Sequence, residues 1–117
     1  MQKNKADILV VGICASGKSS VVDRLQELGY QAKSCAQEHS YVESLWSKLE
    51  PNFMVVLDCS YETIKKRRDV QWGLSRIKVQ KERLQHAIEN CDLYLQTDEL
   101  SIEETVQIIV DKYQQII

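Results

Sequence analysis

The chain has 117 residues, which suits a single domain spanning 1–117. Its 15 Lys and Arg against 17 Asp and Glu leave a net charge of −2, so overall charge provides no attraction to nucleic acid. The apolar run at 8–11 is too short for a signal-peptide core or a membrane span, and a cytoplasmic protein without a membrane partner is therefore expected. The four cysteines are widely spaced and contain no C-x-x-C pair, which favours reduced thiols.

The first half of the chain predicts two strands alternating with two helices. Residues 8–11 (ILVV) form a continuous apolar run closed by a glycine, typical of a buried strand in a parallel sheet. A helix is expected over 18–28, because its apolar residues form one stripe and Gly29 stops it. Residues 30–35 predict a weaker strand whose polarity favours a sheet edge. Apolar residues at i, i+3, i+4 and i+7 predict a second helix over about 39–49.

The second half continues the alternation. Residues 53–57 (FMVVL) predict another buried strand, and Ser60 is a good N-cap for a helix over about 61–69. A further helix, a short strand and a capping box that opens the last helix are expected at about 75–90, 93–95 and 101–104. Strands alternating with helices predict an α/β fold with a parallel sheet of about four strands. The first strand is expected in its centre and the second at its edge.

Residues 12–19 (GICASGKS) fit the pattern G-x-x-x-x-G-K-[ST] and lie between a predicted buried strand and a predicted helix. Glycines at 12 and 17 allow the backbone to turn so that successive N–H groups point inward at an anion, next to the positive end of the helix. Lys18 can reach the β and γ phosphates of a nucleotide, and the Ser19 hydroxyl can ligate Mg²⁺. The alternative is a chance glycine turn. The expected phosphate-binding residues are Gly12, Ile13, Cys14, Ala15, Ser16, Gly17, Lys18, Ser19 and Ser20.

The first strand, GICASGKSS and the following helix together resemble the small P-loop kinases that phosphorylate shikimate, gluconate, dephospho-coenzyme A and nucleoside monophosphates. Residues 57–67 are similar to the stretch before the lid of those enzymes, where an arginine matching Arg67 packs on the base or guards the triphosphate. Residues 95–101 are similar to their final loop, which skirts the adenine. The resemblance implies a three-layer αβα P-loop NTPase fold that binds ATP and Mg²⁺.

The chain departs from that family in two places. The interval between Tyr30 and Phe53 is short, whereas the family carries its acceptor-binding subdomain and another strand there. The lid is also reduced, to roughly 69–76. Asp58 looks like a Walker B carboxylate after its buried strand, but the residues that follow align it with a later, non-catalytic strand. Both interpretations of Asp58 stay open.

Basic residues downstream are candidates to neutralise the charge of a transferring phosphoryl group. They are Arg67, Arg68, Arg76 and Arg83. With Lys18, Arg67 and Arg76 are taken as the catalytic candidates, although four consecutive basic residues at 65–68 cannot share one helix face. Glu38 and His39 follow the predicted second strand, where they would either handle an acceptor hydroxyl or a water, or cap the second helix.

The sequence therefore predicts a protein that binds Mg·ATP and acts as a minimal kinase or a slow ATPase. The N-K-x-D and D-x-x-G motifs of GTPases are missing, which favours adenine over guanine. The rival prediction is a degenerate kinase that binds nucleotide and serves as a regulatory or scaffold module. A third possibility is that a partner protein or a second copy of the chain completes an acceptor site, whose acceptor the sequence does not name.

Overall fold

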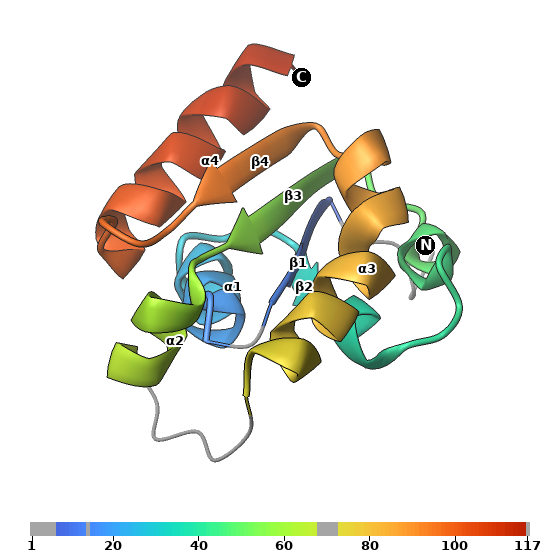
Figure 1. The fold of residues 1–117 in the computed structure, drawn as a ribbon. Coiled ribbons are helices and arrows are strands. Elements are labelled where there is room, and N and C mark those ends of the chain that lie inside the picture. The colour runs from blue at the N-terminus through green and yellow to red at the C-terminus, as the bar shows by residue number, and fades with distance from the viewer. Residues whose placement is uncertain (1–6, 14, 68–72, 117) are drawn as a thin grey trace.

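A four-stranded, entirely parallel sheet forms the centre of the protein. The computed structural model describes residues 7–13, 15–67 and 73–116. The strands are β1 (Ile8–Gly12), β2 (Ala32–Ser34), β3 (Phe53–Asp58) and β4 (Leu93–Gln96), in the order β2-β1-β3-β4 (Figure 1). The predictions of a parallel α/β sheet, an internal first strand and a second strand at the edge are confirmed. That second strand is shorter than the predicted 30–35.

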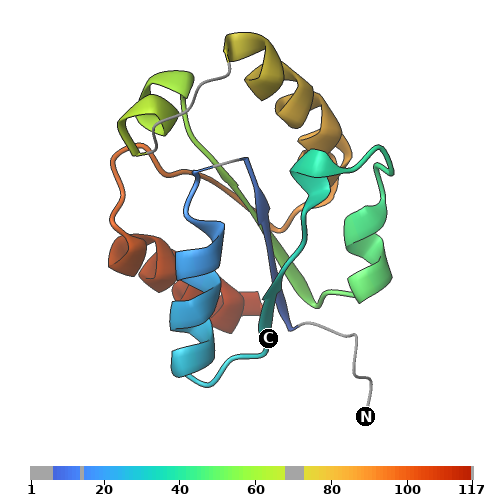
Figure 2. The same cartoon turned by 90° about the horizontal axis from the view of Figure 1, so that it is seen from below.

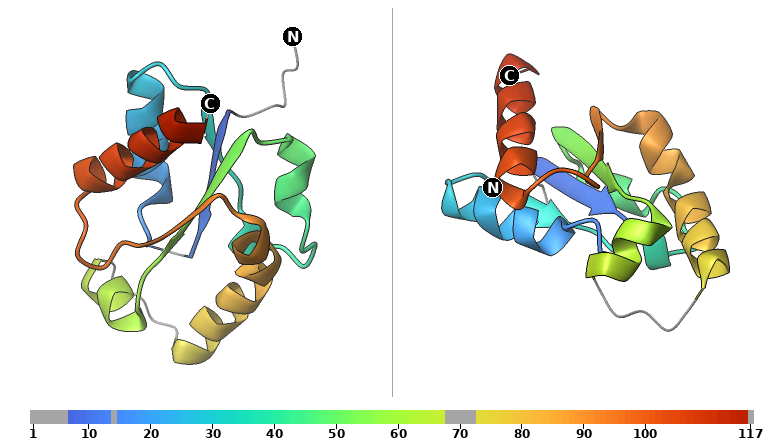
Figure 3. Two further views of the ribbon diagram at one scale, coloured as in Figure 1. Left: turned by 90° about the horizontal axis from the view of Figure 1, so that it is seen from above. Right: turned by 60° about the vertical axis from the view of Figure 1, so that its left-hand side comes forward.

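Helices cover both faces of this sheet. They are α1 (Lys18–Glu27), α2 (Tyr61–Arg67), α3 (Leu74–Asn90) and α4 (Ile102–Ile116), with short 3-10 helices η1 (Gln37–His39) and η2 (Leu45–Leu49). Helices α1 and α4 lie on one face, and α3 lies on the other together with η1 and η2 (Figures 2 and 3). Among the described residues, no helix is long and apolar enough to span a bilayer.

Alternating side chains of the two central strands build a separate core on each face. In β1, Ile8 and Val10 pack against residues of α1 and α4, whereas Leu9 and Val11 pack against residues of α3. All four are fully buried. A strand covered on both faces needs apolar residues at every position, which is why β1 and β3 are continuous apolar runs in the sequence.

The predicted helix over 39–49 is wrong, because this segment forms only the 3-10 helices η1 and η2 with irregular backbone between them. Side chains form hydrogen bonds with backbone N–H and C=O groups that would pair with each other in an α-helix. Ser40 Oγ accepts from the Val42 N–H at 3.0 Å, and the buried Gln37 amide bonds the Val42 carbonyl and the Trp46 N–H. Such local bonds compete with helix formation.

Two predicted helix starts are confirmed by their hydrogen bonds. Ser101 and Glu104 form the reciprocal capping box, with both bonds at 3.0 Å. Ser60 Oγ accepts from the Thr63 N–H at 3.2 Å at the start of α2. The predicted end of that helix, at 69, lies outside the described residues.

Asp98 joins the loop after β4 to the start of α2. Its Oδ1 accepts from the Thr63 hydroxyl at 2.6 Å and from the Ser60 N–H at 2.9 Å. These bonds favour the charged carboxylate, and the bond from Thr63 above all lowers the pKa of Asp98 to about 2.

Replacing Asp98 by Asn should therefore destabilise the fold in a pH-dependent way. The folded-state pKa lies below the ordinary value of 3.8, so the carboxylate contributes its full stability above that value and loses it as pH falls towards about 2. Urea unfolding of the wild type, Asp98→Asn and the exposed control Asp23→Asn at several pH values measures this. A deficit in Asp98→Asn that stays constant down to the lowest pH would contradict the assignment.

Candidate functional site

The segment that leaves β1 begins at a glycine with no room for a side chain. A Cβ at Gly12 would lie 2.4 Å from the Leu57 carbonyl oxygen and 2.7 Å from Ser16 Oγ. The next residue donates its N–H to the same carbonyl, from Ile13 N to Leu57 O at 3.3 Å. The loop is thus seated against the end of β3, at the carboxyl edge of the sheet.

Helix α1 begins directly after this loop with an open N-terminus. Gly17 is its N-cap with φ of 101°, a left-handed conformation that favours glycine. No side chain of the described residues caps the helix, and its first turn contains no acidic residue. The first backbone N–H groups of a helix lack intrahelical partners and carry the positive end of the helix dipole. The start of α1 can therefore receive an anion.

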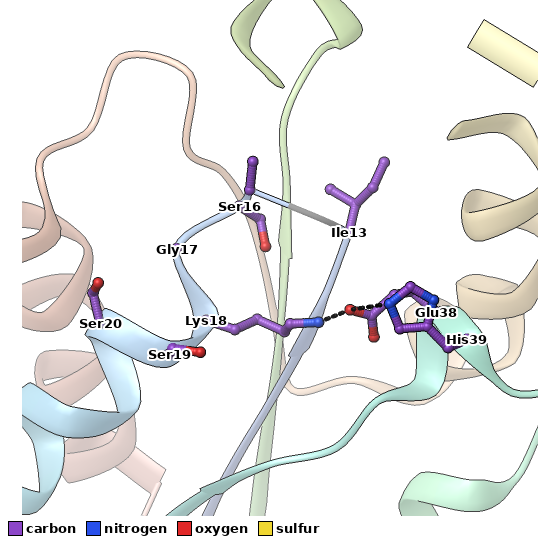
Figure 4. A pocket seen from close by; sticks show the side chains of 9 residues that line it. Ile13, Ser16, Gly17, Lys18, Ser19, Ser20, Glu38 and His39 are labelled. Atoms are coloured by element: carbon purple, nitrogen blue, oxygen red, sulfur yellow. Dashed lines mark hydrogen bonds and ion pairs between the residues drawn. The ribbon is translucent and has the colours of Figure 1, made fainter. Parts of the chain in front are cut away.

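Lys18 points from the first turn of α1 into the interior (Figure 4). Its ammonium donates to the Gly12 carbonyl at 2.9 Å and forms an ion pair with the Glu38 carboxylate. The Glu38 side chain is only 4% exposed, and its Oε1 has no hydrogen-bond partner among the described residues. The interpretation of Glu38 as a cap of a second helix is wrong, since that helix does not form and the carboxylate faces Lys18.

His39 lies beside this ion pair, with its Nε2 3.8 Å from Glu38 Oε2. Its side chain is largely exposed. Partial burial lowers the pKa of His39, and the nearby charges of Lys18, Arg83 and Arg76 lower it further. The imidazole is therefore neutral at neutral pH in this arrangement.

Two cavities flank the loop. The lysine pocket, of about 230 Å³, is lined by Ile13, Ala15, Ser16, Gly17, Lys18, Ser19, Ser20, Glu38 and His39. The arginine pocket, of about 320 Å³, is lined by Ala15, Ser16, Gly17, Ser20, Arg67, Thr97, Leu100, Ser101, Ile102 and Thr105. Residues 15–17 and Ser20 line both, so a ligand wrapped around the loop can enter both. Ser20 points away from Lys18 (Figure 4).

Arg67, a candidate site residue from the sequence, lies against the loop. Its guanidinium donates to the Ala15 carbonyl at 2.9 Å, to Thr97 Oγ1 at 3.1 Å and to the Thr97 carbonyl. The buried Thr97 in turn donates to the Ser16 or Asp58 carbonyl. Thr97 was not singled out by sequence reasoning, because a single threonine after a short strand carries no recognisable signal.

The remaining candidate residues from the sequence differ in where they lie. Arg83 donates to the Glu38 carbonyl at 3.4 Å and lies over the Tyr41 ring, with its Cζ 4.4 Å from the centroid. Arg76 lies in the first turn of α3 and lines neither pocket, although its charge helps to lower the pKa of His39. Cys14 and Arg68 lie outside the described residues.

Asp58 uses both carboxylate oxygens within the protein. Oδ1 accepts from the Cys59 N–H at 2.8 Å and lies 3.9 Å from the Lys81 ammonium, and Oδ2 accepts from the Tyr94 hydroxyl at 2.5 Å. It lines neither pocket. This geometry favours the structural interpretation of Asp58 over the Walker B one.

Comparison with known proteins adds no family. No protein-family model matches the chain, and no curated protein matches it significantly.

The close approach at Gly12 gives a stability test. Gly12→Ala should destabilise the fold by about 1–3 kcal/mol, because the new methyl group overlaps a backbone carbonyl that cannot move without shifting β3. Gly73→Ala is the matched control, since a Cβ there has no atom of the described residues within 4 Å. Chemical unfolding of both variants measures the difference. Equal stability of Gly12→Ala and Gly73→Ala would contradict the geometry.

Proposed function

We propose that residues 12–20 bind the phosphates of a nucleoside triphosphate, with Mg·ATP as the ligand. One observation carries the proposal: the Lys18 ammonium and the uncapped start of α1 border the same pocket. Phosphate groups bind where a flexible cation and a set of backbone N–H donors border the same cavity. It supports the P-loop NTPase fold that the sequence resemblance implies.

Magnesium fits this site as part of the ligand. Mg²⁺ bound with phosphates takes only one or two protein ligands and fills its other positions with phosphate oxygens and waters. Ser19 lines the lysine pocket from the first turn of α1. Its hydroxyl is exposed and next in sequence to Lys18, so it is the proposed metal ligand. Bound magnesium would offset phosphate charge beside Lys18.

The arginine pocket is proposed to take the nucleoside. It combines the Arg67 guanidinium with the apolar side chains of Leu100 and Ile102, and it opens on the far side of the shared loop residues. A planar base needs apolar contact and a few polar groups to orient it. The three hydrogen bonds of Arg67 hold its guanidinium beside that space.

Two activities remain in competition. The intact phosphate loop supports a minimal kinase or a slow ATPase, with Lys18 stabilising phosphate charge and Arg67 and Arg76 as the further cations. The short segment between β2 and β3 supports a degenerate nucleotide-binding module. Gln37, buried in that segment, also bonds the Arg83 carbonyl at 3.4 Å and so fastens the segment onto α3. An acceptor site supplied by a partner or a second copy would reconcile the two.

Replacing Lys18 tests phosphate binding, and the choice of variant must take account of the Lys18–Glu38 ion pair. Lys18→Ala would remove the cation that pairs with the buried Glu38, so this variant perturbs the fold as well as the phosphate site. At a pH where His39 is neutral, we expect that variant to lose about 3 kcal/mol of stability. The double variant Lys18→Ala/Glu38→Gln should recover most of the loss and still fail to bind Mg·ATP.

Thermal unfolding with and without Mg·ATP provides the measurement. At a hundred times Kd the ligand stabilises a folded protein by about 2.7 kcal/mol, so the wild type and the control Lys65→Ala should show a clear rise in Tm. The double variant should show none, and GTP should raise the Tm of the wild type less. A double variant that responds to Mg·ATP as the wild type does would refute the proposal.

Catalysis is expected to be slow. Phosphoryl transfer depends on holding the acceptor in line with the γ-phosphate and on excluding water. The interval between Tyr30 and Phe53 is too short for an acceptor pocket and lid of the usual size. Incubation with ATP, magnesium and panels of nucleoside monophosphates, shikimate, gluconate and dephospho-coenzyme A should give weak ATP hydrolysis and little transfer. Turnover of any acceptor at around 10 per second would instead establish a competent kinase.

A further inference from the structure

Glu38 is a buried carboxylate whose charge is balanced by Lys18, the same residue that is proposed to bind the phosphates. Its Oε2 pairs with Lys18, whereas its Oε1 lacks a hydrogen-bond partner in the described part of the chain. The side chain is 4% exposed and lines the lysine pocket. When Lys18 turns towards a phosphate, the carboxylate is left as a buried charge that needs another cation.

His39 is the neighbour in position to replace Lys18. Its Nε2 is 3.8 Å from the Glu38 oxygen that Lys18 now holds, and Figure 4 shows the imidazole beside that carboxylate. Arg83 approaches only the backbone carbonyl of Glu38, and its guanidinium lies over the Tyr41 ring. The exposed histidine can move closer without disturbing the core.

We propose that a polyphosphate binds through an exchange of partners, in which Lys18 leaves Glu38 for the anion and His39 gains a proton and pairs with Glu38. The inference rests on the proposed phosphate site and adds His39 to it. The imidazolium keeps Glu38 neutralised, so the full charge of Lys18 is available to the ligand. The acid form of the buffer supplies the proton and is left as its conjugate base, and the proton forms an N–H bond on the unprotonated nitrogen of the imidazole.

The exchange makes binding depend on pH. In the free protein, burial and the cations Lys18, Arg76 and Arg83 keep the pKa of His39 below its ordinary value of 6.5. Pairing with the Glu38 carboxylate raises the pKa in the complex. Binding therefore takes up a proton between these two pKa values, and affinity increases as pH falls through that interval.

The partner exchange can be tested without any ligand. Lys18→Met imitates the departure of Lys18, and NMR titration then gives the pKa of His39 in the wild type, Lys18→Met, Glu38→Gln and Lys18→Met/Glu38→Gln. We expect Lys18→Met to raise the pKa by about one unit when Glu38 is present and by much less in Glu38→Gln. An equal rise in both backgrounds would mean that only the repulsion by Lys18 was removed, and would overturn the exchange.

The chain contains one other histidine, which serves as an internal control. His86 accepts from Trp46 Nε1 at 3.0 Å and lines neither pocket, so its ring signals should be the same in all four proteins. A parallel shift of His86 would indicate a general disturbance of the fold.

Calorimetry with inorganic tripolyphosphate in metal-free buffers of different ionisation enthalpy tests the coupling to binding. Between the free and bound pKa values of His39, the wild type should take up part of a proton for each anion bound. His39→Gln and Glu38→Gln should bind without that uptake. Binding by the wild type without proton uptake, or equal uptake by His39→Gln, would overturn the exchange alone. A complete lack of binding would overturn the proposed phosphate site as well.

Discussion

The Leu57 carbonyl occupies the space that a side chain at residue 12 would need, and the loop that follows depends on this contact. Because Gly12 has no Cβ, β1 can end directly against β3, and the Ile13 N–H bonds the same carbonyl. The chain then turns, and α1 starts at Lys18 with its N-terminus towards the carboxyl edge of the sheet. Both cavities border this loop, so their positions depend on the same contact.

The cations on the two sides of the loop have different partners. Lys18 is paired with the buried Glu38 carboxylate, whereas Arg67 donates hydrogen bonds to carbonyl and hydroxyl oxygens. A ligand entering the lysine pocket must therefore compete with a carboxylate. A ligand entering the arginine pocket meets an ordered cation. The two sides suit different parts of one molecule, a polyphosphate on the first and a nucleoside on the second.

The sequence predicts the strands, the helices around 18–28, 61–69 and 75–90 and the C-terminal capping box, because each depends on local periodicity or on a local cap. It fails at 39–49, where side chains such as Gln37 bond the backbone in place of a helix. The motif also locates the loop. The Lys18–Glu38 pair could not be predicted from sequence, because the two residues are 20 positions apart in the chain. Their contact depends on how the chain after β2 is placed beside the start of α1.

The most direct measurement of the central claim is an NMR titration of the backbone amides with Mg·ATP. The account predicts that the largest shifts fall on residues 15–20 and, on the nucleoside side, on residues 97–102. Adenosine alone should perturb only the second group, and inorganic tripolyphosphate mainly the first. Shifts confined to another surface, such as the groove between α1 and α4 lined by Tyr30 and Val110, would contradict the account. So would the lack of any saturable shift at millimolar Mg·ATP.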